Sequence, residues 1–347
     1  MGALPKPTQG LVMPTLEEVA QRSGVSRSTV SRVINNDPHV SEETRQKVLQ
    51  AIAELDYHPN AVARSLAAGH TQIIGLVIPT AVAMLFSDPY FPRLIQGVAA
   101  ECNASDYSVM LWIGEPEYER RTIHRHLNSG LLDGIIVASA VRGDPVVSAL
   151  QQSGLPFVMV GRPDDPTISY VDVDNVHGAR EAVLHLLRQG YRRVATITGP
   201  LNTAAAFDRL EGYRAALQSR GIAVDENLIA EGDFTEESGV LAMRKLLPHK
   251  PDAVFCASDT MAQGAMRVIR GEGLRIPEDI AIVGYDDMPF AVNLDPPLTT
   301  VRQPIERMGQ EAVKLLLDLL AHPNDGPHRL VLPTELIIRA STVRGNS

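Results

Sequence analysis

The 347-residue sequence lacks the features that would place it in several broad classes of protein. It does not begin with a basic segment followed by an apolar run, and no apolar stretch is long enough to span a membrane. We therefore expect a soluble, cytoplasmic protein. It has only two cysteines, Cys102 and Cys256, which lie far apart in apolar surroundings. We expect them to be buried free thiols and not a disulfide.

Common catalytic and nucleotide-binding motifs are also missing. The sequence contains no Gly-x-x-x-x-Gly-Lys-Ser/Thr loop, no Gly-x-Ser-x-Gly elbow and no His-Glu-x-x-His pair. His124 and His126 stand two positions apart in a helical pattern, so they face different directions, and we interpret them as surface residues. The sequence therefore predicts a protein that is not an enzyme and that needs no metal or cofactor.

An overall excess of positive charge is absent as well, because the formal net charge is -9. Any role in nucleic-acid binding must therefore depend on where the charges lie. Between Ser26 and Asn36 the sequence has Arg27 and Arg32 and no acidic residue. Hydrophobic residues make up 44% of the chain, which is enough to bury the cores of two or three domains.

Residues 14–59 are predicted to form a small all-α domain. Thr15 and Glu18 match a capping box, which starts a helix. Gly24 and Val25 form a turn, and Ser26 is expected to cap the second helix of a helix-turn-helix. Ser41 is expected to cap a third helix. The side chains predicted to form the small core include Val30, Val33, Ile34, Val48, Ile52 and Leu55.

The outer face of the second helix is short, hydroxylated and basic. Arginine can bind guanine O6 and N7 through two hydrogen bonds, and Ser, Thr and Asn contact bases or phosphates. This composition suits the major groove of DNA, whereas the alternative is an ordinary three-helix bundle with a solvated polar face. The residues predicted to contact DNA from this helix are Arg27, Ser28, Thr29, Ser31, Arg32 and Asn35.

Residues 60–72 are predicted to be a hinge. Asn60 and Gly69 would begin and end a helix that is too short to be stable alone, so it would fold only against a partner. Leu66 has no obvious core to enter. We interpret it as a wedge between base steps in the minor groove, with Asn60 and Arg64 as further DNA contacts, and the alternative is a plain linker. Residues 1–13 are expected to be a disordered extension, unless Met13 is the true start.

From Ile73 onward, apolar strand patterns alternate with helical patterns such as Gly178–Gln189 and Asp259–Gly271. Near-continuous apolar strands separated by helices predict α/β lobes with parallel sheets that are covered on both faces. We expect one lobe at 73–171 and 303–331, and a second lobe at 172–302 and 332–343. The predicted buried strands are Ile73–Ile78, Ser108–Ile113, Gly134–Ala138, Phe157–Val160, Val194–Thr198, Ala253–Ala257 and Ile280–Gly284.

The ordered series of motifs resembles the lactose/galactose/purine repressor family over residues 14–343. The resemblance is carried by Thr15-Leu-x-x-Val-Ala, Gly24-Val-Ser-x-x-Thr-Val-Ser-Arg-Val-x-Asn35, Val40-Ser-x-x-Thr-Arg-x-Lys-Val48, Tyr57-x-Pro-Asn60, Asp208-Arg-Leu-Glu-Gly-Tyr213, Val283-Gly-Tyr-Asp-Asp287 and Pro296-Pro-Leu-Thr-Thr-Val301. It implies a body like that of periplasmic binding proteins, with a ligand between two Rossmann-like lobes. It also implies a homodimer that binds a palindromic double-stranded operator, with Leu66 at the wedge position. No heptad repeat follows Arg339, which favours a dimer over a tetramer.

The effector site is expected at the carboxyl ends of the parallel strands, where such sheets bind ligands. Tyr90 and Phe91 could stack on a sugar or base ring, or pack at a helix start. The resemblance implies that Arg209 grips the effector and that Phe234 covers it, while Asp286 is placed to accept hydrogen bonds from the ligand. The residues predicted to bind effector are Tyr90, Phe91, Ser139, Arg162, Arg209, Phe234, Ser258, Asp286 and Gln303.

Two departures from the family pattern affect the choice of ligand. Ser258 stands where several sugar-responsive members have Asn, and Gly161 stands where an Asp is common, which leaves Arg162 as the nearest polar group. Fewer amide and carboxylate groups at these two positions imply that the ligand has a different pattern of hydroxyl groups. The predicted function is a ligand-responsive repressor of a carbohydrate-utilisation operon, with a sugar as effector. A regulator that responds to a nucleobase, nucleoside or other metabolite is one alternative, and a solute-binding protein without a regulatory role is another.

Overall fold

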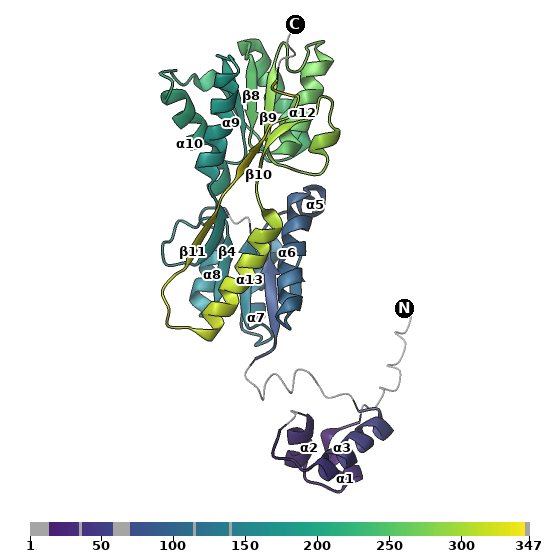
Figure 1. The fold of residues 1–347 in the computed structure, drawn as a ribbon. Helices are drawn as coiled ribbons and strands as arrows, with labels where there is room; N and C mark the ends of the chain where they lie inside the picture. The colour runs from purple at the N-terminus through teal and green to yellow at the C-terminus, as the bar shows by residue number, and fades with distance from the viewer. Residues whose placement is uncertain (1–13, 35–36, 58–69, 114–115, 139–140, 344–347) are drawn as a thin grey trace, which may run out of the picture. The chain divides into compact units, whose positions relative to one another are not determined.

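A computed structural model describes residues 14–34, 37–57, 70–113, 116–138 and 141–343 of the chain. It divides into two compact units, Met1–Thr71 and Gln72–Ser347, which we call the head and the body (Figure 1). Among the described helices, none is long and apolar enough to cross a membrane.

The head contains α1 (Leu16–Ser23), α2 (Arg27–Ile34) and α3 (Glu42–Leu55). The predicted capping box is confirmed, since the Glu18 N–H donates to Thr15 Oγ1 at 3.3 Å and the Thr15 N–H donates to Glu18 Oε2 at 2.6 Å. Gly24 ends α1 at a φ of 70°, a conformation that glycine adopts without strain. The predicted caps Ser26 and Ser41 accept hydrogen bonds from Thr29 N–H and Thr44 N–H. The fully buried core residues are Val19, Ala20, Val30, Val33, Val48, Ala51 and Tyr57.

The body consists of two lobes, each built on a six-stranded sheet (Figure 1). Lobe 1 has the strand order β11-β5-β4-β3-β1-β2, all parallel. Its strands are β1 (Ile73–Val77), β2 (Ser108–Trp112), β3 (Gly134–Ala138), β4 (Phe157–Val160), β5 (Tyr170–Val173) and β11 (Arg329–Leu332). Its helices are α5 (Val82–Ser87), α6 (Tyr90–Ala104), α7 (Pro116–Leu127), α8 (Pro145–Ser153) and α13 (Ile305–Ala321).

Lobe 2 has the order β12-β10-β9-β8-β6-β7, in which only the β10–β12 pair is antiparallel. Its strands are β6 (Val194–Thr198), β7 (Ile229–Glu231), β8 (Ala253–Cys256), β9 (Ala281–Asp286), β10 (Thr299–Arg302) and β12 (Glu335–Ile337). Its helices are α9 (Asn175–Arg188), α10 (Ala204–Gln218), α11 (Glu236–Leu246) and α12 (Asp259–Gly271), with short 3₁₀ turns at Glu226–Leu228, Leu247–His249 and Ala291–Asn293.

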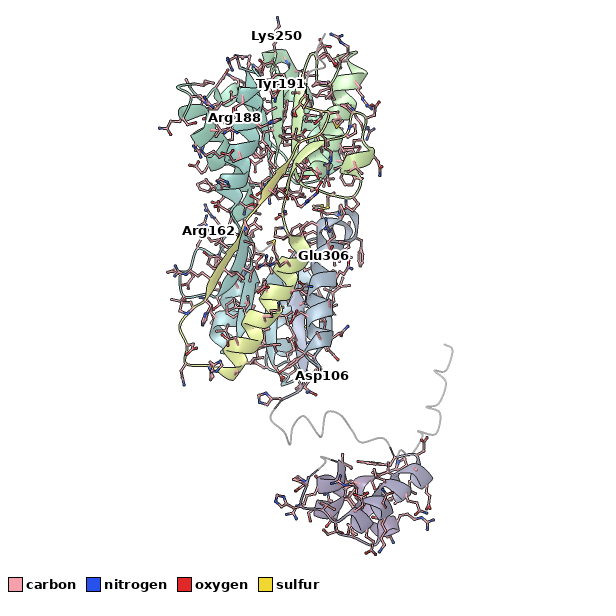
Figure 2. All side chains as sticks on the ribbon, in the orientation of Figure 1. Asp106, Arg162, Arg188, Tyr191, Lys250 and Glu306 are labelled. Carbon is pink, nitrogen blue, oxygen red and sulfur yellow. The ribbon has the colours of Figure 1, made fainter. Side chains whose placement is uncertain are left out.

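The chain passes between the lobes three times: from β5 into α9, from β10 into α13, and from β11 into β12. Figure 2 shows Arg162 and Glu306 at the left and right edges of the body, near the level where the lobes meet. The third crossing is too short to hold a helix, so β12 enters lobe 2 as an antiparallel edge strand. The predicted parallel sheets are correct except for this strand.

The apolar strands owe their composition to burial on both faces. In β3, Ile136 and Ala138 belong to one core of lobe 1, while Ile135 and Val137 belong to the core on the opposite face. Successive side chains of a strand point to opposite faces, so both must be apolar when helices cover both. At one such helical layer α6 and α13 lie so close that a Cβ at Gly97 would collide with the backbone of Glu306.

The structure corrects the bounds of two predicted elements, adds one helix and confirms the prediction for the cysteines. The predicted helix at Gly178 begins three residues earlier, because Asp174 accepts a hydrogen bond from His177 N–H at 2.9 Å and caps α9. The strand predicted at Ile280–Gly284 runs from Ala281 to Asp286. The short helix α5 was not predicted. Cys102 and Cys256 are buried free thiols, as predicted.

Candidate functional site

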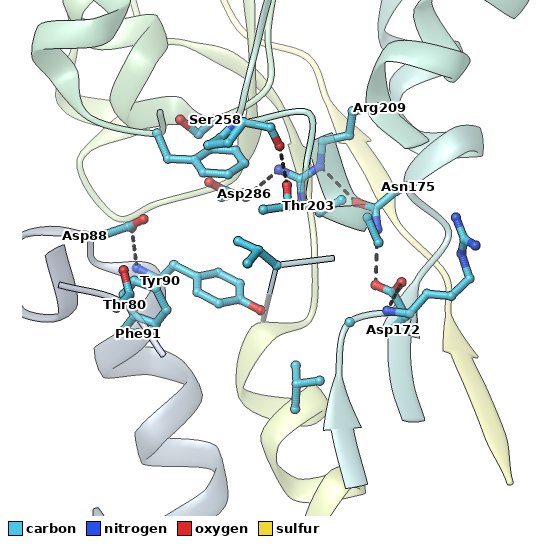
Figure 3. Close-up of a pocket in the computed structure, with 18 of the residues that line it drawn as sticks. Thr80, Asp88, Tyr90, Phe91, Asp172, Asn175, Thr203, Arg209, Ser258 and Asp286 are labelled. Carbon is cyan, nitrogen blue, oxygen red and sulfur yellow. Dashed lines mark hydrogen bonds and ion pairs between the residues drawn. The ribbon is translucent and has the colours of Figure 1, made fainter. Parts of the chain in front are cut away.

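A cavity of about 320 Å³ lies between the lobes, at the carboxyl ends of their strands (Figure 3). Eight of the nine predicted effector residues line it, and the ninth, Ser139, lies outside the described residues. We call it the inner cavity. Its polar and aromatic lining consists of Thr80, Asp88, Tyr90, Phe91, Arg162, Asp172, Asn175, Asn202, Thr203, Arg209, Asp233, Phe234, Ser258, Asp286 and Gln303.

Arg209 is the most firmly held of these side chains. It projects from α10 and is only 5% exposed. Its Nε donates to Asn175 Oδ1 at 2.9 Å and its Nη1 donates to the Ala257 carbonyl at 2.6 Å (Figure 3). Its guanidinium also lies over the Tyr285 ring at 3.7 Å. These contacts fix its orientation, so a ligand that binds it would cost little further side-chain entropy.

Asp286 faces Arg209 from the end of β9, with 3.8 Å between the carboxylate and Nη1. Gln303 Nε2 donates to the same carboxylate oxygen at 2.5 Å. Burial raises the pKa of Asp286 well above its usual value, with Asp259 and Asp88 adding to the effect, while Arg209 opposes it. A carboxyl group with a raised pKa can donate as well as accept a hydrogen bond. Its backbone φ of 115° is strained for a non-glycine residue, which is a common feature of binding sites.

Asp172 and Asn175 complete this wall, although the sequence reasoning missed both. Asp172 Oδ1 accepts from Asn175 Nδ2 at 3.1 Å, and Oδ2 accepts from Arg162 N–H at 3.0 Å. Burial raises the pKa of Asp172 to about 6, against the opposing effect of its N–H donors and of Arg209. The sequence did not predict β5 as a strand. It therefore did not place Asp172 and Asn175 at the carboxyl end of a strand, where ligands bind.

Aromatic side chains form the remaining walls. Tyr90 and Phe91 begin α6 with their rings edge to face at 5.5 Å, and Asp88 accepts a hydrogen bond from Tyr90 N–H at 2.9 Å. Phe91 is 5% exposed and belongs to the core of lobe 1, so packing at the helix start accounts for most of its surface. Phe234 has a φ of 71°, and its ring packs so closely on Gly199 that a Cβ at that position would collide with it.

The inner cavity contains both amide and carboxylate groups. Four carboxylates and three amides line the inner cavity, because Asp88, Asp172 and Asp233 supply groups that the two family departures remove elsewhere. Ser258 lines the cavity but also caps α12, where its Oγ accepts from Met261 N–H at 3.1 Å. Within the described part of the chain, no group of three or more His, Cys, Asp or Glu side chains is arranged to hold a metal ion.

In the head, α2 presents the predicted polar face to solvent. The side chains of Arg27 and Arg32 are 71% and 66% exposed. Each also lies near an acidic residue outside α2, since Arg27 pairs with Glu17 at 2.8 Å and Arg32 lies 3.9 Å from Asp37. Exposed pairs of this kind contribute little to stability, so DNA phosphates can replace the acids as partners. The predicted contacts Asn35, Asn60, Arg64 and Leu66 lie outside the described residues.

Both the head and the body match families of known proteins. Residues 15–60 match the model of bacterial regulatory proteins of the lacI family, and residues 183–342 match a periplasmic binding protein-like domain. The chain is 44% identical to the HTH-type transcriptional regulator CelR of Thermobifida fusca, over 94% of this chain and 98% of the relative. It is 36% identical to the ribose operon repressor of Escherichia coli K12, over 95% and 100%.

Solved structures show the same likeness. A complex of the transcriptional regulator CelR with cellobiose matches with a TM-score of 0.76 and 42% identity, covering 94% of this chain and 99% of the other. The lac repressor dimer bound to operator and an anti-inducer matches with a TM-score of 0.84 and 31% identity, covering 96% and 100%. The matches thus cover both units of this chain, the helix-turn-helix head and the body. The chain belongs to the lacI family of bacterial regulatory proteins.

Proposed function

We propose that the protein is a transcriptional repressor that binds a palindromic operator as a homodimer, and that an uncharged sugar in the inner cavity sets its affinity for DNA. The observation that carries the proposal is the inner cavity itself. It combines carboxylates, amides and a fixed arginine with three aromatic rings. Hydroxyl groups of a sugar find donors and acceptors there, and its apolar ring faces find aromatic surfaces.

The charge of the lining favours an uncharged ligand. Asp88, Asp172, Asp233 and Asp286 outnumber the two arginines, Arg162 and Arg209. Even with Asp286 protonated, the acids more than balance the arginines. A phosphorylated sugar or a nucleotide would bring negative charge into a site that already holds it, so both are disfavoured.

The relatives give this proposal its first ligand to test. CelR was solved with cellobiose, and the lac repressor was solved as a dimer on its operator. The main alternative effector is a nucleobase or nucleoside, which suits aromatic walls and hydrogen-bonding side chains equally well. Among the relatives, the HTH-type transcriptional repressor PurR of Escherichia coli O139:H28 is 35% identical over 96% of this chain. Neither effector implies a catalytic step, and we assign the protein none. We place its action in the cytoplasm, where the operator lies.

Mechanistically, the ligand would act through the arrangement of the lobes. Arg209, Asp286 and Phe234 belong to lobe 2, whereas Tyr90 and Arg162 belong to lobe 1. A ligand that contacts both walls favours one relative position of the lobes, and a preference between two positions is all that allostery requires. In the dimer, that position would set the spacing of the two hinges, and with it the fit of Leu66 and α2 to DNA.

The test combines operator binding with a ligand panel. A labelled fragment carrying the palindrome upstream of the gene is titrated with protein, with a scrambled fragment as control. Sugars and purine bases are then added at a fixed salt concentration, because DNA affinity depends steeply on salt. We expect specific retention of the palindrome and a shift in its affinity with one or more neutral sugars. If purine bases alone change the affinity for the operator, the effector is a nucleobase and not a sugar. If the protein does not bind the palindrome more tightly than the scrambled fragment, the proposed role in transcription is contradicted.

A further inference from the structure

A second cavity, of about 170 Å³, adjoins the inner cavity. The two share four lining residues, Val141, Met159, Arg162 and Ala204. The other walls of the second cavity come from the loop at 142–144, from Val147, Ser148 and Gln151 on α8, and from the segment 163–168 that connects β4 to β5. We call it the outer chamber. The contacts described for the inner cavity do not involve the loop at 142–144 or the segment 163–168, so we consider the outer chamber as a separate site.

Arg162 forms the partition between the two spaces. It follows β4 on lobe 1, and its Nη2 and Nε donate to the two oxygens of Asp208 on α10 of lobe 2, at 2.6 and 3.3 Å. The guanidinium is therefore held across the lobe boundary by a charge-assisted, two-point contact. Arg162 lines both cavities. A ligand that extended from one cavity into the other would therefore pass beside its guanidinium N–H groups.

The outer chamber has the chemistry of a second site for a polar ring. Gln151 Nε2 donates to Asp165 Oδ2 at 2.6 Å, and Arg142 pairs with Asp164 at 3.3 Å. These groups stand beside the apolar side chains of Val147 and Ile168. Small-molecule sites combine an apolar surface with a few fixed polar groups in this way.

A residue that lines the outer chamber, Arg142, also contacts lobe 2. The Arg142 N–H donates to the Asn202 carbonyl at 2.8 Å, and the Arg142 guanidinium lies over the Phe207 ring at 4.7 Å. Both partners belong to lobe 2, whereas Arg142 itself belongs to lobe 1. A ligand in this chamber would therefore touch a second boundary between the lobes, in addition to the one at Arg209.

We propose that the outer chamber is a second sugar subsite, so that the effector is a disaccharide or a longer saccharide. One ring occupies the inner cavity, the next ring occupies the outer chamber, and the glycosidic linkage passes Arg162. This inference rests on the proposed function, since it presumes that the inner cavity takes a sugar. A monosaccharide in the inner cavity would leave the contacts around Arg142 and Gln151 unused.

Calorimetric titration of the full-length protein tests the subsite. The probes are the monosaccharides glucose, galactose and ribose, and the disaccharides cellobiose, maltose, lactose and sucrose. We expect at least one disaccharide to bind about tenfold or more tightly than either of its component monosaccharides, a difference of about 1.4 kcal/mol. A wild-type protein that binds a monosaccharide as tightly as every disaccharide overturns the second subsite and leaves the proposed function standing. An absence of binding by all seven sugars overturns both.

A matched pair of variants localises the effect. Ser148 lies on the exposed side of α8 and lines the outer chamber, whereas Gln152 is an exposed residue of the same helix outside the lining. We expect Ser148→Phe to fill the chamber and remove the preference for the disaccharide, with monosaccharide affinity unchanged. Gln152→Phe should keep the wild-type preference. If Ser148→Phe retains the full preference while it folds and binds operator normally, the second ring does not occupy this chamber.

Discussion

At the scale of single residues, Arg209 is the side chain on which effector binding should depend most. It is fixed by Asn175, Ala257 and the Tyr285 ring before any ligand arrives. We expect Arg209→Ala to weaken effector binding by about 10- to 150-fold, because a hydrogen bond from a charged group contributes about 1.5–3 kcal/mol. Titration of operator with and without effector measures the loss.

The matched control for Arg209 lies on the same helix. Arg214 on α10 pairs with Glu211 at 3.0 Å and does not line the inner cavity. Arg214→Ala should leave the dose-response curve unchanged. Arg209→Ala also leaves Asp286 without its cation, so its folding is checked by operator affinity without effector, which should stay near the wild-type value. A wild-type dose-response curve for Arg209→Ala would remove Arg209 from the site.

Asp172 makes a prediction about pH. Burial raises its pKa to about 6 in the folded protein, whereas an unfolded Asp has a pKa of about 4. Folding therefore favours the protonated carboxyl, and the stability that it adds is complete below about pH 4 and lost as the pH rises through about 6. We expect the free energy of unfolding of the wild type, minus that of Asp172→Asn, to fall by roughly 2 kcal/mol between about pH 4 and 7. Urea unfolding across this range measures it, and a constant difference would show that Asp172 has an ordinary pKa.

At the scale of elements, the loop that carries Phe234 depends on the loop after β6. The Phe234 ring lies where a Cβ on Gly199 would have to be. We expect Gly199→Ala to displace the ring, weaken effector binding about tenfold or more, and cost about 1–3 kcal/mol of stability through overpacking. Thermal unfolding and ligand titration measure the two effects. The control is Gly271→Ala at the end of α12, where a Cβ would meet nothing within 4 Å. Equal effects from the two substitutions would contradict a specific role for Gly199.

Most of the strands that could be predicted from the sequence are those made up mainly of apolar residues. The strands β1, β3, β4 and β8 are continuous runs without a charged or hydroxylated residue, because helices cover both faces, and such runs stand out from their surroundings. By contrast, β5 contains the buried Asp172 and β12 is a three-residue edge strand, so neither has a clear pattern.

The same reason explains which site residues were found. Arg209 and Asp286 lie within recognisable motifs next to predicted strands, whereas Asp88 precedes a helix and Asn175 lies within one. Their place in the site depends on how two lobes face each other, which no local pattern encodes. The head was predictable in more detail because its caps and turn are local chemistry, as Thr15, Gly24 and Ser41 show.

At the scale of the whole molecule, the segment after β9 connects the inner cavity to both lobes. Asp286 lines the cavity, and the next residue, Asp287, accepts hydrogen bonds from Arg302 at 2.7 Å and Arg339 at 2.5 Å. Met288 then inserts into the core of lobe 1 and is 1% exposed. Because Asp286 and Met288 are only two residues apart, a ligand that displaced Asp286 would also displace a side chain packed in the other lobe.

This arrangement predicts that Met288 carries part of the coupling between effector and operator. Met288→Ala should reduce the ratio of operator affinities with and without effector several-fold, since a cavity at this position lets lobe 1 move independently of Asp286. Leu316→Ala, in the same core but on α13, is the matched control. Both substitutions should cost about 2–5 kcal/mol of stability, as large-to-small changes in a core do. Only the first should lower the coupling ratio, because Met288 lies two residues from the cavity-lining Asp286, whereas Leu316 has no cavity-lining residue next to it in the chain. If both variants lower the ratio equally, or neither does, coupling does not run through this segment.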